Sequence, residues 1–173
     1  LLWLRIRTVG RQCHASTPAE GVNAFTAASH LVVKLRELYR VYGHSNPVFL
    51  PPVSTFEATR KEENIPNINT VPGDDVFYLD CRILPDYTVE EIKKTIRAMA
   101  DEIEHDFGVT VELSPVQEHQ APEPTAPDAP VVVALQRALK KVYGVDGVPT
   151  GIGGGTVAAF FRRAGFPAVV WSK

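Results

Sequence analysis

The sequence predicts an α+β fold in which a four-stranded antiparallel sheet carries two helices on one face. Four separate stretches alternate apolar and polar residues as strands do. Two stretches between them repeat apolar residues at helical spacing, each behind a capping motif. Their order along the chain is β-α-β-β-α-β, which is typical of a ferredoxin-like sandwich.

Residues 1–11 form the first predicted strand. Leu2, Leu4 and Ile6 point to one side, while Trp3 and the arginines between them point to the other. This alternation is typical of a half-buried antiparallel strand.

The first helix is expected to begin after a polar turn. Thr17 is the predicted N-cap, Pro18 fits the first helical position and Glu20 completes a capping box. Gly43 is expected to end the helix. The predicted buried stripe consists of Val22, Phe25, Val32, Leu35, Tyr39 and Tyr42.

Two strands are expected next, over 53–60 and 75–84, with a polar turn region over 61–73 between them. In the second of these strands, Val76, Tyr78 and Asp80 alternate with Phe77, Leu79 and Cys81.

The second helix has a capping box at Thr88 and Glu91, and Gly108 ends it. The fourth strand follows over 109–113. The predicted buried stripe of the helix is Val89, Ile92, Ile96, Met99, Ile103 and Phe107.

These elements predict a lid, or dimerisation, domain over residues 1–117. A Pro- and Ala-rich hinge linker is expected over 118–130, and 131–173 reads as an incomplete part of a second, α/β domain. The tail is expected to contain a helix ending near Gly144, a glycine-rich turn, a short helix ending near Ala164 and a buried strand over 166–171.

Composition excludes several classes of protein. The 173 residues carry a formal net charge of −2 and no long apolar run, so nucleic acid and membranes are not expected partners. Two cysteines without a CxxC motif fit a reduced, cytoplasmic protein. Because both ends are strand-like runs without partners, we expect the chain to be a fragment of a longer enzyme.

His14 is the main candidate for a catalytic residue. It lies in a polar turn between a strand and a helix, where functional groups are often mounted on rigid elements. Its imidazole could donate to a developing oxyanion. The simpler interpretation is a surface histidine bonded to a nearby carbonyl.

Three other features are weaker candidates. Arg82 could grip a substrate carboxylate through a bidentate pair, or be an ordinary salt-bridged strand residue. Asn69 could donate to a substrate carbonyl, or simply serve the turn. The run Gly153, Gly154, Gly155 and Thr156 could form an anion-binding nest, or a tight turn.

The remaining histidines are expected to be structural or solvated, and none makes a metal-binding motif. They are His30, His44, His105 and His119.

Together these segments resemble the zinc-dependent aminoacylase/carboxypeptidase metallopeptidase family, which includes acetylornithine deacetylase and succinyl-diaminopimelate desuccinylase, enzymes of amino-acid biosynthesis. The resemblance rests on 10–18 (GRQCHASTP) with 21–24 (GVNA), on 69–72 (NTVP) followed by 79–82 (LDCR), and on 153–156 (GGGT) with 166–169 (FPAV).

The resemblance implies a parent enzyme in which two zinc ions, or cobalt, share a water that attacks an amide. In that enzyme His14 would reach across a homodimer to stabilise the oxyanion, assisted by Asn69. Arg82 would bind the substrate carboxylate, and the residues of 153–156 would lie against the substrate. N-succinyl-diaminopimelate and N-acetylornithine are the expected substrates, with small peptides next.

The sequence also departs from the family. Its zinc ligands and catalytic glutamate do not appear in the chain, so we expect no bound zinc and no activity from this chain alone. Val157 stands where many members have Asp, which indicates a variant subgroup. The competing hypothesis is a non-catalytic ferredoxin-like module used for association or ligand sensing.

Overall fold

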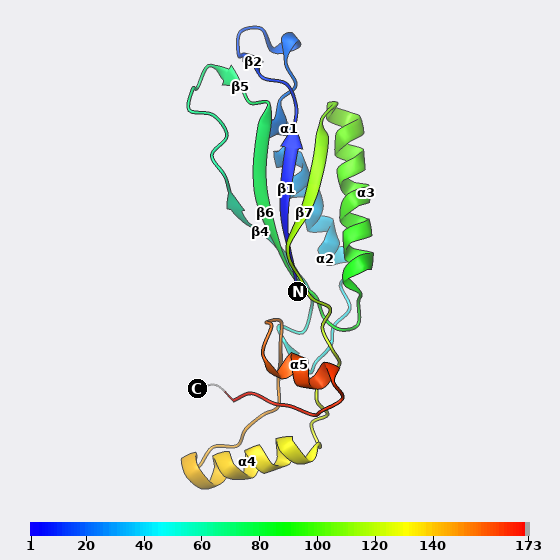
Figure 1. The fold of residues 1–173 in the computed structure, drawn as a ribbon, viewed down its shortest axis with the longest axis vertical. Helices are drawn as coiled ribbons and strands as arrows, with labels where there is room; N and C mark the ends of the chain where they lie inside the picture. The colour runs from blue at the N-terminus through cyan, green and yellow to red at the C-terminus, as the bar shows by residue number, and fades with distance from the viewer. Residues whose placement is uncertain (172–173) are drawn as a thin grey trace.

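The computed structural model describes residues 1–171 as an elongated molecule, with a sheet-and-helix domain at one end and a smaller segment at the other (Figure 1). Ser172 and Lys173, where the strand-like run at the end of the chain finishes, lie outside the described residues. The elements are β1 (Leu2–Val9), β2 (Cys13–His14), η1 (Pro18–Glu20), α1 (Ala24–Lys34), η2 (Leu35–Glu37), α2 (Leu38–Val41), β3 (Phe49–Leu50), β4 (Thr55–Lys61), β5 (Thr70–Val71), β6 (Asp74–Arg82), α3 (Val89–Phe107), β7 (Thr110–Glu118), α4 (Pro130–Tyr143), β8 (Gly151–Ile152) and α5 (Ala158–Arg163).

The predicted sheet is confirmed. Its strands lie in the order β4-β6-β1-β7, and every neighbouring pair is antiparallel. β1 occupies the centre, with Leu4 opposite Leu79 of β6 and Ile6 opposite Leu113 of β7. This is the strand order of a ferredoxin-like sandwich.

Helices α1 and α3 cover one face of this sheet (Figure 1). The side chains that alternate inward from β1, Leu2, Leu4 and Ile6, are at most 1% exposed. They join a single apolar core with Phe77 and Leu79 of β6. Burial of this shared face is what holds the helices to the sheet.

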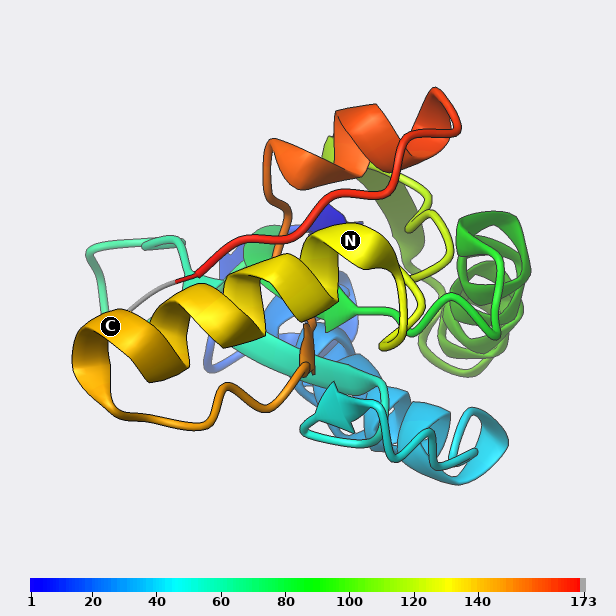
Figure 2. The same cartoon turned by 90° about the horizontal axis from the view of Figure 1, so that it is seen from below.

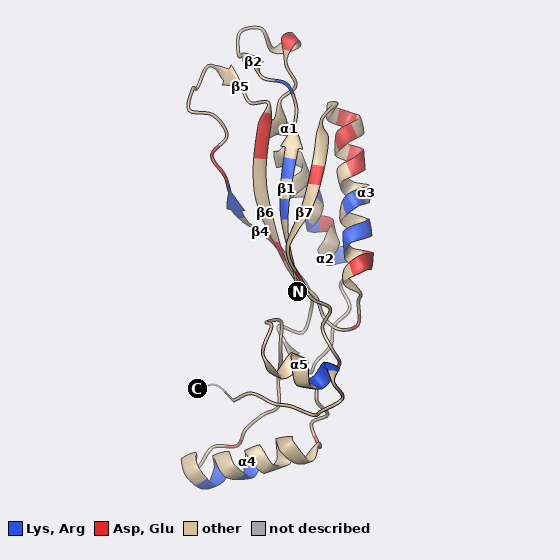
Figure 3. Cartoon of the chain, in the orientation of Figure 1, with Lys and Arg blue, Asp and Glu red and all other residues tan. Residues whose placement is uncertain are grey.

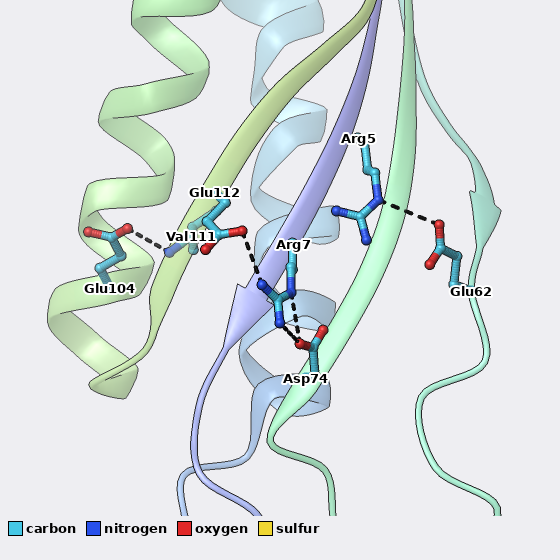
Figure 4. A network of polar contacts seen from close by, with 7 residues as sticks. All are labelled: Arg5, Arg7, Glu62, Asp74, Glu104, Val111 and Glu112. Atoms are coloured by element: carbon cyan, nitrogen blue, oxygen red, sulfur yellow. Dashed lines mark hydrogen bonds and ion pairs between the residues drawn. The ribbon is translucent and has the colours of Figure 1, made fainter.

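The other face of the sheet is open and carries ion pairs (Figure 4). Arg7 of β1 lies between its neighbouring strands, with Nε donating to Asp74 at 2.8 Å and Nη1 donating to Glu112 at 3.3 Å. Arg5 lies 3.6 Å from Glu62. The alternating pattern of β1 follows because one face of this antiparallel sheet is buried and the other is exposed to solvent.

The predicted start of the first helix is wrong. Thr17 makes no capping bond, and the residues after it form only the short turn η1. Arg11 and Val22 instead pair through two backbone hydrogen bonds of 2.8 and 2.9 Å, which keeps Val22 extended. α1 therefore begins after Asn23, whose side chain accepts from the Thr26 N–H at 3.0 Å.

The end of that helical region also differs. The predicted helix is interrupted by the 3₁₀ turn η2 and continues as α2 to Val41. Tyr42, not Gly43, is its C-cap. Tyr42 turns inward, where its hydroxyl donates to the carbonyl of Glu91 at 3.0 Å and fixes this region against α3.

The second helix is confirmed at both ends. Thr88 and Glu91 form the full capping box, and Gly108 ends α3 in the left-handed conformation with φ of 67°. Figure 3 shows that the outer face of α3 mixes acidic and basic residues, as expected for a solvent-facing helix surface.

Two small ladders were not predicted. β2 pairs antiparallel with β5 at the far end of the sheet domain, and β3 pairs parallel with β8. The first ladder joins the turn after β1 to the turn before β6. The second joins the loop after α2 to the glycine-rich tail, so the tail is tied to the sheet domain by backbone hydrogen bonds.

The tail contains α4, which Gly144 ends, and α5, both as predicted. The predicted buried strand over 166–171 is wrong: this stretch is irregular, and Phe166 and Val170 are more than 60% exposed. It runs beside α4 (Figure 2), where Tyr143 and Trp171 stack with ring centroids 5.1 Å apart. Within the described residues no strand pairs with it, and an apolar run without a partner does not form a strand.

Candidate functional site

The turns at the far end of the sheet domain bring His14 and Asn69 together. His14 lies in β2 directly opposite Thr70 of β5, the residue after Asn69. The N–H of Ala15 donates to the carbonyl of Asn69 at 2.8 Å. We call this region, built from β2, η1 and β5, the tip (Figure 1).

Close backbone packing at the tip depends on Gly21. A Cβ at this position would lie 2.4 Å from Cys13 Sγ and 2.8 Å from the carbonyl oxygen of Arg11. Both distances are too short for any side chain. Glycine therefore lets the segment after His14 fold back against β2, which holds His14 in place.

The His14 imidazole contacts Ser16 through Nδ1 and Asn69 through Nε2. The Ser16 N–H donates to Nδ1 at 3.2 Å, and Ser16 Oγ lies 2.7 Å from the same nitrogen. A backbone N–H only donates, so this contact puts the proton of a neutral ring on Nε2, whereas donation from the Asn69 amide to Nε2 puts it on Nδ1 with Ser16 Oγ as its acceptor. The ring is exposed.

Asn69 lies at the other ring nitrogen. Its Nδ2 lies 3.3 Å from His14 Nε2. In the tautomer with the proton on Nε2, this N–H and the Asn69 amide can both donate to one oxygen placed beside them. This is the arrangement that stabilises an oxyanion during attack on an amide carbonyl.

Arg82 lies at the opposite end of β6. Its Nε and Nη2 donate to the two carboxylate oxygens of Asp80, both at 2.7 Å. Its guanidinium lies 5.7 Å from the centre of the Trp3 ring. The edge of Arg82 that could grip a substrate carboxylate is therefore occupied by Asp80 in this structure.

The glycine run meets Arg82. A Cβ on Gly153 would lie 3.1 Å from the Cβ of Arg82, so these two positions are in direct contact. Gly154 and Gly155 have free space around them. Thr156 accepts the N–H of Ala159 at 3.0 Å where α5 begins, and Val157 beside it is 70% exposed.

The predicted site residues thus form two separate groups. His14 and Asn69 lie at the tip, whereas Arg82 and the run that starts at Gly153 lie where the tail joins the sheet domain. Strand β6 separates them, and the eight steps between its nine residues span roughly 26 Å at ~3.3 Å per step. Within one copy of the chain, the two groups cannot act on the same small substrate.

Three contributing residues were missed by reasoning from the sequence. Ser16 contacts Nδ1 of His14, and Asp80 and Trp3 contact Arg82. Asp80 could have been identified, because residues two apart on a strand share a face. The Trp3 contact depends on the pairing of β1 with β6, which no local pattern reveals.

The described residues do not fit a zinc site. Among residues 1–171, no three His, Cys, Asp or Glu side chains gather closely enough to hold a metal ion. His30 packs 4.7 Å from the Phe107 ring, and His44 Nε2 lies 3.6 Å from Asp86. Both histidines therefore make structural contacts with neighbouring side chains.

Comparison with known proteins identifies the family of the chain. The sequence profile of the peptidase dimerisation domain of the M20 metallopeptidases matches residues 1–107. The chain belongs to this family. It is also 38% identical, over 99% of its length, to an uncharacterized metallohydrolase of Methanococcus maripaludis. It is 24% identical over 75% of its length to an acetylornithine deacetylase of Aliivibrio salmonicida.

The fold of this M20 dimerisation domain recurs in solved structures. A tripeptidase from Staphylococcus aureus superposes on 96% of the chain with a TM-score of 0.70 and 20% identity. The chain spans 44% of the Methanococcus protein, 35% of the deacetylase and 41% of the tripeptidase. Within the part of the chain that the structure describes, no helix is long and apolar enough to cross a bilayer.

Proposed function

We propose that the chain supplies the dimerisation domain, and a C-terminal part of the catalytic domain, of an enzyme that hydrolyses amide bonds. The expected substrates are N-acyl amino acids of the N-succinyl-diaminopimelate or N-acetylornithine type, with small peptides next. The observation that carries the proposal is the approach of two side chains at the tip, where His14 Nε2 and Asn69 Nδ2 lie 3.3 Å apart. Membership of the M20 family supports the reaction class.

In this proposal His14 and Asn69 act on a substrate held by a second copy. The separation between the tip and Arg82 along β6 supports action in trans, because one copy alone cannot bring the two groups to one substrate. His14 would donate from Nε2 to the oxyanion, with Nδ1 accepting the Ser16 N–H. Asn69 would donate to the same oxygen.

Arg82 would bind the carboxylate of the substrate. To do so it must exchange the bidentate pair with Asp80 for one with the ligand, which is a chemically matched replacement. The run 153–156 would lie beside the bound substrate, since Gly153 already contacts Arg82.

Zinc is the metal that the family resemblance implies for the parent enzyme. The described residues do not supply its ligands, so no step here is assigned to it. The exposed Phe160, Phe161 and Phe166, each more than half exposed, support the proposal that the tail belongs to a larger catalytic domain. Two free cysteines, Cys13 and Cys81, support a cytoplasmic location.

The edges of the sheet indicate which surface receives the second copy. At the β7 edge, Arg97 of α3 donates to the carbonyl of Val111 at 2.6 Å. The N–H of Val111 donates to the Glu104 carboxylate, also at 2.6 Å (Figure 4). These side chains occupy the backbone groups that another strand would need. β7 is therefore blocked at this point.

The β4 edge differs. Residues 57–61 of this strand are exposed, and a groove of about 510 Å³ lies between them and α1. Apolar residues of α1, including Phe25 and Val33, line it. We assign the homodimer contact to this groove and the β4 edge.

Substitution of His14 in the full-length parent enzyme tests the catalytic proposal. His14→Ala should lower kcat by on the order of 10²-fold or more, because an oxyanion donor acts only in the transition state. His44→Ala, an exposed histidine outside the tip, is the matched control and should keep full activity. A loss of only a few fold for His14→Ala would favour the non-catalytic association module, which predicts altered dimer affinity instead.

A further inference from the structure

Asp75 is the most deeply buried charged residue of the described part of the chain, and the proposed function gives it no catalytic role, although it lies at the groove beside β4. It is 1% exposed and lies at the start of β6, opposite Thr8 of β1. A buried carboxylate is costly unless it is paired and hydrogen-bonded. The partners of Asp75 therefore indicate its role in the structure.

Those partners come from the segment that leads to the tip. Lys61, the last residue of β4, pairs with Asp75 Oδ1. Asn64 Nδ2 donates to Asp75 Oδ2 at 2.9 Å, and Asn64 Oδ1 accepts the N–H of Ile65 at 2.7 Å. One carboxylate thus fixes two points of the chain between β4 and β5.

Asn64 is the anchor nearest to Asn69 on one side. On the other side, Asn69 is held through its carbonyl by Ala15 and by the β2–β5 ladder. Between these anchors, residues 66–68 are exposed, and Ile68 is fully so. The position of Asn69 at His14 therefore depends on two anchors, one of which is the buried Asp75.

We propose that Asp75 and Asn64 are positioning residues that hold Asn69 against His14. The inference rests on the proposed function for its catalytic meaning, but not for its structural content. Removal of the Asn64 contact should release the loop while leaving the core of the sheet in place. Asp75 itself has a neighbour, Thr8 Oγ1, that is buried and has no hydrogen-bond partner within the described residues. Asp75 is therefore the more disruptive site to change.

Hydrogen exchange of the whole 173-residue chain, followed amide by amide by NMR, tests this proposal. In Asn64→Ala, the Ala15 N–H that donates to Asn69 should exchange roughly tenfold faster or more, because a charge-assisted hydrogen bond that restrains the loop is lost. Amides of β1 and α3 should keep their wild-type rates. The 15N shifts of the His14 ring should change, since Asn69 moves away from Nε2.

Asn67→Ala is the matched control, an exposed asparagine in the same loop, and should leave the Ala15 amide unchanged. Asp75→Asn is the second variant and should reproduce the effect of Asn64→Ala. An unchanged Ala15 amide in Asn64→Ala overturns the proposal. Equal acceleration of all amides also overturns it, because that result means general stabilisation rather than positioning.

A kinetic readout extends the test to the parent enzyme. Asn64→Ala should lower kcat about tenfold with KM unchanged, since a displaced oxyanion donor affects only the transition state. Hydrogen exchange and enzyme kinetics test two separate claims. Normal exchange refutes the positioning role, whereas altered exchange with normal kcat refutes the catalytic role of Asn69 proposed above.

Discussion

Cys13 and Cys81 lie in contrasting surroundings. Cys81 faces inward from β6 and is 0% exposed. Burial in this apolar core raises the pKa of its thiol to about 12. Cys13 lies in β2 at the tip and is only half-buried. The thiolate is the reactive form, so the two residues should differ in reactivity.

We expect iodoacetamide at pH 8 to modify Cys13 and spare Cys81 in the folded chain. A thiol with a pKa of about 12 is ionised in about one molecule in 10⁴ at this pH. Peptide mass spectrometry after a timed reaction measures both sites. The same reaction in guanidinium chloride is the control, in which both cysteines should be modified. Equal modification in the folded chain would contradict the buried setting of Cys81.

At the scale of single residues, the sequence identified His14, Asn69 and Arg82 as candidates from their place in turns and strands. It did not reveal how they are held. The Asn69 contact with His14 and the Asn64 bond to Asp75 join residues whose approach depends on chain reversal. Side-chain contacts of this kind follow from the fold and not from local spacing.

Among the elements, α3 shows the strongest agreement between sequence and structure. Thr88 and Glu91 satisfy each other's backbone N–H groups at its start. The hydroxyl and the N–H of Thr88 donate to the Glu91 carboxylate and lower its pKa below the usual 4.5. A group with a lowered folded pKa stabilises the fold above its unfolded pKa, and this contribution is lost as the pH falls through the folded value.

Thr88→Ala should therefore destabilise the chain by about 1 kcal/mol at pH 7, the usual cost of losing such a cap. The difference from wild type should shrink as the pH falls below 4.5, because Glu91 then becomes protonated in the folded chain as well. Urea unfolding at pH 7 and across the acidic range measures it. Thr110→Ala, an exposed threonine outside the cap, is the control. A deficit that does not change with pH would show that the Glu91 carboxylate contributes nothing.

Helix α1 shows the limit of local signals. Thr17, Pro18 and Glu20 have the composition of a helix start, yet the chain forms only η1 there. The pairing of Arg11 with Val22 extends the backbone just where the helix would have continued. A tertiary contact that satisfies two backbone groups outweighs a capping preference worth about 1 kcal/mol.

The two sheet edges lead to a prediction about association. Val33 on α1 lines the groove beside β4 and is 68% exposed, and Val116 on β7 is 57% exposed. Val33→Glu should raise the dimer dissociation constant at least about tenfold, because it places a charge in an apolar contact. Val116→Glu, the same change at the other edge, should leave it unaltered.

Sedimentation equilibrium of the two variants measures this difference. The reverse result, with Val116→Glu weakening the dimer and Val33→Glu inert, would place the second copy at β7 instead.

At the scale of the whole molecule, the tip and the junction with the tail lie at opposite ends of the sheet domain (Figure 1). The junction is held by the β3–β8 ladder and by Thr125, whose hydroxyl donates to the carbonyl of Ala168 at 2.7 Å and accepts its N–H at 3.1 Å. The predicted hinge is thus tied to the tail rather than free.

We expect the purified chain to contain no stoichiometric zinc and to hydrolyse no N-acyl amino acid. The physical reason is that residues 1–171 bring no three potential ligands together. Elemental analysis of protein prepared without chelators or metal-affinity resin measures the content directly. One or two zinc ions per chain would mean a ligand set formed in another way, with His14 and His119 the first residues to test.

The sequence by itself determined the sheet, the two covering helices and the identity of the candidate residues. These depend on alternation, helical spacing and caps, which are properties of neighbouring positions. The tertiary structure decided where α1 begins, that residues 166–171 form no strand, and which residues meet. Each of these outcomes depends on a partner distant in the chain. The Arg11–Val22 pair, the β2–β5 ladder and the Asp75 contacts exist only once the backbone has folded back.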